Sequence, residues 1–133
     1  MKKIISTMLM ILVLVSSCAP KTNLIDSKWQ LNDLSGQAIP ADVTVTLNLG
    51  SDSIGGSDGC NSYGGSYTDG KASIQFGEDI FHTEMYCNDE IQTVSTAYYA
   101  ALVQATAYEL SGDRLILRDA NGTVLAEFIK SVN

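Results

Sequence analysis

The residues of this sequence that could do chemistry are few: three cysteines, one histidine and a scatter of acids and hydroxyls. A cysteine nucleophile at Cys60 would need a base beside it, and His82 is distant in sequence. A single histidine without a partner at a recognisable spacing is typical of a surface or strand residue, so the sequence predicts no enzyme. A hydrolase remains the alternative, and its candidate acid–base and hydroxyl groups are Asp58, His82, Glu84, Ser62 and Ser66.

Metal and phosphate sites are weakly indicated as well. Tetrahedral zinc would lack ligands, because the sequence has one histidine and no CxxC pair. A calcium loop needs ligands at alternate positions, which Asp52, Asp58 and Asn61 do not supply. A phosphate cradle at the glycines around Cys60 would need a lysine or a helix start directly after them, and the residues there are typical of strands. We therefore expect no metal and no cofactor.

The first of the three cysteines, Cys18, lies at the end of a predicted secretory leader. Lys2 and Lys3 precede an apolar run over residues 4–15, which is too short to span a membrane. Val15-Ser16-Ser17-Cys18 resembles the bacterial lipobox, and this resemblance implies cleavage before Cys18 and a lipid on its sulfur. The alternative is an ordinary secreted protein with an unrelated cysteine at the cleavage site.

These features predict three segments: a lipoprotein signal peptide over 1–17, a lipidated tether over 18–26 and one domain over 27–133. Two or three acyl chains would anchor the chain stably in a membrane. Ala19 rather than aspartate follows Cys18, so the inner-membrane retention signal of enteric bacteria is absent. We expect a protein of the cell envelope, lipid-anchored in the outer membrane and facing the periplasm.

The charge of the chain is acidic, with 8 Lys+Arg against 15 Asp+Glu, and loss of the leader would remove Lys2 and Lys3. This balance argues against nucleic acid as a partner and against a polybasic contact with anionic lipid headgroups. The scattered acids favour a soluble, self-repelling surface and a monomer.

Two cysteines remain in the domain, Cys60 and Cys87. In an oxidising compartment they predict a disulfide that stabilises the fold by about 3–4 kcal/mol. Asn61 would bond nearby backbone at this point, and Cys60 would fix a sharp strand reversal to the start of a helix. The surrounding glycines suit positive φ angles or close chain approach, and they are Gly55, Gly56, Gly59, Gly64 and Gly65.

The remaining pattern is one of strands around a single helix. Residues 43–49 alternate apolar and polar, and shorter alternations occur at 29–31 and 72–76. Turn dipeptides delimit three further strands at about 107–111, 114–118 and 123–130. Between 88 and 105 the apolar spacing changes to three and four, which predicts a helix capped by Asn88. The fold class is therefore α+β: a strongly twisted antiparallel, barrel-like sheet of about seven or eight strands with one covering helix.

Two motifs carry a resemblance to a known family. The run Gly59-Cys60-Asn61, followed by Thr83, Met85 and Cys87 ahead of the helix, resembles the META/HslJ-like family of bacterial envelope proteins. The likeness extends from Trp29 to about Phe128 and implies an antiparallel barrel with one helix and no established catalysis. Links of that family to heat stress and drug tolerance suggest a stress-related role. One departure is Glu84, where the family commonly has a basic residue.

The sequence thus predicts a non-enzymatic, membrane-anchored lipoprotein that acts as an interaction or structural module with a possible envelope protein partner. The alternative is a barrel that binds a small molecule or lipid, or that assists secretion. Four tyrosines could line such a barrel, namely Tyr63, Tyr67, Tyr86 and Tyr98.

Overall fold

The computed structural model describes residues 23–132. The elements in chain order are β1 (Ser27–Leu34), β2 (Thr46–Leu49), β3 (Ser53–Ser57), β4 (Ser62–Asp69), β5 (Ile74–Phe76), β6 (Phe81–His82), α1 (Asp89–Gln104), β7 (Ala107–Ser111), β8 (Arg114–Arg118) and β9 (Val124–Lys130). The single helix and the many short strands confirm the predicted fold class.

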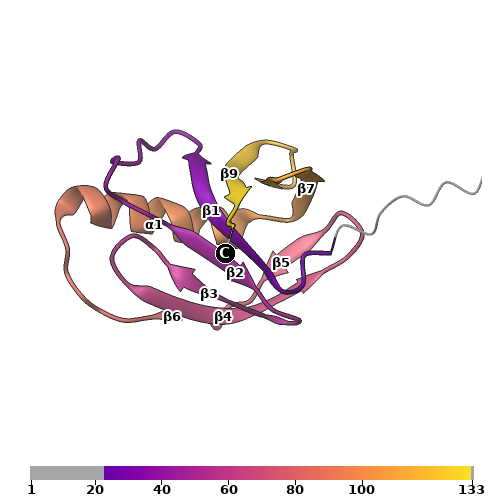
Figure 1. Cartoon of the computed structure of the whole chain (residues 1–133), viewed down its shortest axis with the longest axis horizontal. Helices are drawn as coiled ribbons and strands as arrows, with labels where there is room; N and C mark the ends of the chain where they lie inside the picture. The colour runs from indigo at the N-terminus through magenta and orange to yellow at the C-terminus, as the bar shows by residue number, and fades with distance from the viewer. Residues whose placement is uncertain (1–22, 133) are drawn as a thin grey trace, which may run out of the picture.

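The sheet is antiparallel and nearly closed into a barrel. Its strands follow the order β5-β4-β3-β2-β1-β9-β8-β7, and β6 pairs separately with β4 (Figure 1). A bridge between Ser73 and Ala107 brings the two ends of this path together. The amide of Ile74 donates to the Thr106 carbonyl at 3.2 Å, and the amide of Tyr108 donates to the Ala72 carbonyl at 3.0 Å. Closure of this kind removes most of the unpaired strand edges that would invite aggregation.

Helix α1 packs against β1, β5 and β9 and supplies the second layer of the fold. Asn88 caps it as predicted, because its side-chain oxygen accepts the amide of Ile91 at 2.9 Å. Asp89 and Glu90 occupy the first turn, where the helix dipole favours negative charge. The buried stripe at 94, 98, 101 and 102 has the spacing that the sequence indicated.

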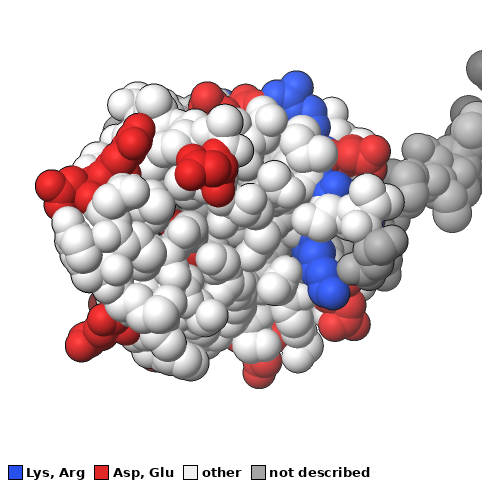
Figure 2. Space-filling view, turned by 60° about the vertical axis from the view of Figure 1, so that its left-hand side comes forward, with Lys and Arg blue, Asp and Glu red and all other residues white. Residues whose placement is uncertain are grey.

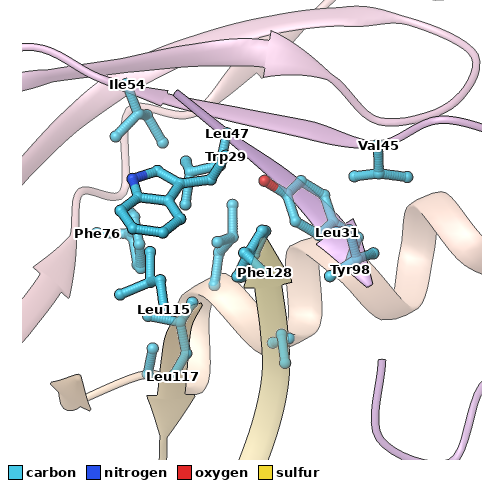
Figure 3. Packing of buried hydrophobic residues seen from close by; sticks show 14 of the residues in the cluster. Trp29, Leu31, Val45, Leu47, Ile54, Phe76, Tyr98, Leu115, Leu117 and Phe128 are labelled. Carbon is cyan, nitrogen blue, oxygen red and sulfur yellow. The ribbon is translucent and has the colours of Figure 1, made fainter. Parts of the chain in front are cut away.

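The hydrophobic core lies between the curved sheet and the helix. Trp29, Leu47 and Phe128 meet there with Tyr98 of α1, whose ring lies edge-on to that of Phe128 (Figure 3). The Trp29 indole donates to the Ser27 hydroxyl at 2.7 Å, so its polar edge is satisfied inside the fold. All buried apolar residues of the described chain lie between Leu24 and Phe128, so the core that the structure describes uses no residue of the predicted leader.

The glycine-rich stretch is more extended than predicted. Most of it forms the paired strands β3 and β4, and only residues 58–61 turn. Gly56 shows why glycine is required inside a strand, because a β-carbon there would lie 2.2 Å from the Thr46 carbonyl oxygen. Strand β2 is shorter than the predicted 43–49, although Val45 still packs in the core and its carbonyl accepts the Leu31 amide at 2.9 Å.

Cys18, the predicted lipidation site, and the predicted leader over 1–17 lie outside the described residues. Within residues 23–132, the structure has no helix with the length and apolar character needed to cross a membrane.

Candidate functional site

The turn between β3 and β4 is built around a buried carboxylate. One oxygen of Asp58 accepts the amides of Cys60 at 2.8 Å and Asn61 at 2.6 Å. Gly59, between Asp58 and Cys60, has a φ of 98°, and a β-carbon there would also come within 2.7 Å of a Val43 methyl. The turn therefore needs an acceptor at 58 and glycine at 59.

The second oxygen of Asp58 faces the helix. It accepts the hydroxyls of Ser95 at 2.8 Å and Tyr99 at 2.9 Å, and Asp58 itself is 0% exposed. Burial by itself would raise the pKa of this carboxyl, but the hydrogen bonds from two amides and two hydroxyls outweigh it and lower the pKa below its ordinary value. Asp58 is thus an ionised anchor between the hairpin and α1, rather than the acid–base or calcium-binding group considered from the sequence.

Asn61 connects the two sequence motifs. Its side-chain oxygen accepts the Thr83 hydroxyl at 2.8 Å and the Met85 amide at 2.7 Å, while its side-chain nitrogen donates to the Met85 carbonyl at 3.2 Å. The Asn61 amide group therefore pairs with both backbone groups of Met85, as a neighbouring strand would. The expectation that Asn61 bonds nearby backbone is wrong, because the backbone that its side chain binds is more than twenty residues away.

The disulfide joins the same two segments. Cys60 and Cys87 are bonded, with their Cα atoms 5.9 Å apart, and Cys87 directly precedes the helix cap Asn88. The bond and the Asn61 side chain therefore hold residues 83–87 against the β3–β4 hairpin at two points. All six motif residues meet at this junction, namely Gly59, Cys60, Asn61, Thr83, Met85 and Cys87.

Comparison with known proteins assigns the chain to a family. The META domain family model matches residues 22–131, nearly the whole described chain. The chain belongs to the META domain family. A search of curated proteins finds no match.

Solved structures share the META fold. An NMR structure of a protein from Burkholderia xenovorans is 26% identical, with a TM-score of 0.68 over 83% of this chain and 85% of that one. A second NMR structure is 19% identical, with a TM-score of 0.61 over 78% and 89% of the two chains. A crystal structure of a DUF4847 family protein from Bacteroides vulgatus is 14% identical, with a TM-score of 0.61 over 80% and 93%. The last two likenesses concern the fold alone.

Beneath the motif junction of the META domain lies a group of tyrosines. The hydroxyls of Tyr63 and Tyr98 are 2.6 Å apart, and the Tyr63 hydroxyl donates to the Thr46 carbonyl at 2.8 Å. Burial raises the pKa of Tyr63, Tyr98 and Tyr99 well above the ordinary phenol value. These rings are therefore neutral packing groups, and Tyr98 is fully buried in the core.

The remaining catalytic candidates are dispersed. His82 is exposed, its Nδ1 lies 2.8 Å from the Thr83 carbonyl oxygen, and its ring stacks on Tyr99 with centroids 5.3 Å apart. The Ser66 hydroxyl donates to Asp79 at 2.8 Å, and Glu84 is exposed. Among residues 23–132, no three His, Cys, Asp or Glu side chains come together in a way that could hold a metal ion.

The sequence did not identify Ser95 and Tyr99 as partners of Asp58. Their spacing of four residues places both on one helix face, which was the available signal. Nothing local indicates that this face meets the hairpin.

The outer side of the motif junction is a shallow cleft of about 240 Å³ lined in part by His82, Glu84, Met85 and Tyr86. At this junction the buried polar groups bond within the domain, and the side chains of residues 81–86 are exposed to the solvent.

The role of Asn61 can be tested directly. We expect Asn61→Ala to lower the free energy of unfolding by about 2–4 kcal/mol, because the amide and carbonyl of Met85 and the Thr83 hydroxyl all lose their partner. Urea denaturation measures the loss, and hydrogen exchange should show faster exchange of the Met85 amide. Asn121→Ala in the exposed β8–β9 connection is the matched control, and an equal effect of both variants would refute the assignment.

Proposed function

We propose that this protein is a non-enzymatic envelope lipoprotein, held by lipid on Cys18 in the outer membrane, whose META domain is an interaction or structural module under envelope stress. The observation that carries the proposal is that the potentially reactive side chains at the motif junction are all engaged in bonds within the protein. Asp58 accepts four hydrogen bonds, the Asn61 side chain makes three, and both cysteines are in the disulfide. A side chain in this state stabilises a fold and is a poor acid, base or nucleophile.

The anchor rests on the sequence around Cys18. The described domain begins at Asn23, only a few residues beyond this cysteine, so a lipid there would hold the domain close to the membrane surface. The acidic charge of the chain supports a monomer and disfavours nucleic acid and direct headgroup binding by the domain itself.

The alternative, a ligand-binding or secretion-assisting barrel, receives less support from the four tyrosines. Tyr63, Tyr67 and Tyr98 are buried, and their hydroxyls are bonded within the protein. Tyr86 is 72% exposed on the outside of the domain and does not line the interior.

The anchor is tested by mass spectrometry of the native protein. We expect the mature chain to begin at Cys18 and to carry the added mass of acyl chains, and we expect Cys18→Ser to shift the protein from the membrane to the soluble fraction or to leave its leader uncleaved. Cys60→Ser is the matched control, because the disulfide cysteine should not affect fractionation. An unmodified amino terminus on the native protein would contradict the proposal.

A further inference from the structure

Residues 81–86 expose three apolar side chains, Phe81, Met85 and Tyr86, here called the distal patch. These side chains are 69%, 59% and 72% exposed, and they fall within one short segment between β4 and α1. Aromatic residues and methionine are enriched at the centres of protein interfaces. Met85 and Tyr86 line one cleft, and Phe81 is exposed on the strand that leads to it, so residues 81–86 offer three apolar side chains to a partner.

Each of the three residues is held in place by a contact already in the fold. Met85 is fixed through its backbone by Asn61, and the Tyr86 hydroxyl donates to Asp89 at 2.7 Å. The Phe81 ring lies over Gly64 of the neighbouring strand, where a β-carbon would come within 2.7 Å of the ring. A segment ordered before binding loses little conformational entropy on binding, which favours affinity.

The charged residues beside the distal patch are all acidic. The sequence has no Lys or Arg between Lys71 and Arg114, and this interval contains Glu84, Asp89 and Glu90 beside the patch. Figure 2 shows the visible Lys and Arg side chains toward the side where the described chain begins, while Asp and Glu side chains occur without them on the opposite side. A partner with positive charge beside apolar side chains would complement this surface.

The position of the patch favours a protein partner over a membrane. In Figure 1 the described chain begins at one end of the long axis, and the connection from β6 to α1 lies at the other. If Cys18 is lipidated, as the proposed function holds, the patch is directed away from the membrane. Acidic residues would also repel anionic headgroups.

We propose that the distal patch is the docking site for a cationic polypeptide segment in which Lys or Arg residues alternate with apolar ones. The apolar side chains of this segment contact Phe81, Met85 and Tyr86, and its cations lie against Glu84, Asp89 and Glu90. The proposal rests on the proposed function for the direction of the patch, but its chemistry depends only on residues 81–90.

The test uses isotope-labelled residues 23–133 and two synthetic peptides, one of alternating lysine and leucine and one of alternating glutamate and leucine. We expect the lysine peptide to bind saturably and to shift the NMR signals of residues 81–90, with an affinity that falls as salt is raised. The glutamate peptide should not bind. Equal binding of both peptides, or shifts elsewhere on the domain, would overturn the proposal without any need for a variant.

Variants test whether the patch residues themselves bind the lysine peptide. The double variant Phe81→Ser/Met85→Ser should weaken the lysine peptide by about tenfold or more, as truncation of interface anchors does. Val103→Ser is the matched control, because Val103 is 72% exposed on α1 outside the patch. Glu84→Lys should weaken binding and reduce its salt dependence. An unchanged affinity in the double variant would overturn the proposal.

Vesicles of phosphatidylglycerol and phosphatidylcholine provide the remaining arm. We expect the lipid-free domain to bind neither kind of vesicle. If it binds vesicles, and Phe81→Ser/Met85→Ser abolishes that binding, the patch binds a membrane rather than a polypeptide and the proposal is overturned. Failure of the docking proposal is distinguishable from failure of the proposed lipid anchor. The peptide experiment contains no Cys18, and the Cys18 mass does not depend on the distal patch.

Discussion

Replacement of Asp58 by alanine is expected to destabilise the domain by about 3–5 kcal/mol, because the two turn amides and the hydroxyls of Ser95 and Tyr99 all lose their acceptor. This is a large part of the total stability of a domain of this size, about 5–15 kcal/mol. The loss should appear in urea denaturation, with Asp42→Ala in the exposed β1–β2 connection as the control that changes little. A loss for Asp58→Ala no larger than that of the control would refute its role as an anchor.

The same carboxylate predicts a pH dependence with a defined sign. The pKa of Asp58 is lower in the folded protein than its ordinary value of 3.8, so the unfolded chain binds the proton more readily. The stabilisation is therefore fully present above that ordinary value and is lost as the pH falls from it toward the lower folded pKa. Asp58→Asn removes the titrating group, so the variant should lose less stability than the wild type over this acid range. Identical pH profiles would contradict the assignment.

The second large effect is expected from the disulfide. Cys60→Ser/Cys87→Ser should lower the free energy of unfolding by about 3–4 kcal/mol, because the unfolded chain regains the freedom that the closed loop removes. Reduction of the wild-type protein should produce a similar loss in the same denaturation experiment. Two freely titratable thiols in the native protein, or equal stability before and after reduction, would show that the bond does not contribute.

The two junction contacts should also be separable. The hydrogen bonds between Asn61 and Met85 do not involve the disulfide sulfurs, so the double serine variant should keep slow exchange at the Met85 amide in its folded state. Asn61→Ala should accelerate this exchange even with the disulfide intact. Because both contacts hold the same segment, their effects on stability are expected to be non-additive.

The sequence alone predicted the elements with strong local patterns. The helix followed from apolar spacings of three and four and from the cap at Asn88, and the last three strands followed from alternation between turn dipeptides. The pairing of Cys60 with Cys87 also followed from the sequence, because only two cysteines remain in the domain. Proposed lipidation at Cys18 likewise depends on a local motif that is read in an extended chain.

A strand reversal was predicted in the glycine-rich stretch, but the glycines themselves were not placed in its strands, for a physical reason. Glycine is needed at positions 56 and 64 of these strands because Thr46 and Phe81 approach too closely for a β-carbon, and these neighbours lie ten or more residues away. Propensity treats glycine as a strand breaker and contains no information about such neighbours.

The sequence by itself determined the fold class, the helix, the cysteine pair and the acidic character of the chain, because each depends on local periodicity, composition or a count. Only the tertiary structure decided what the polar residues do. Asp58 could have been an acid, a calcium ligand or a structural anchor until the packing of α1 placed Ser95 and Tyr99 against it. The exposure of Phe81, Met85 and Tyr86 was equally undecided, because an apolar side chain is buried or exposed according to which segments pack over it.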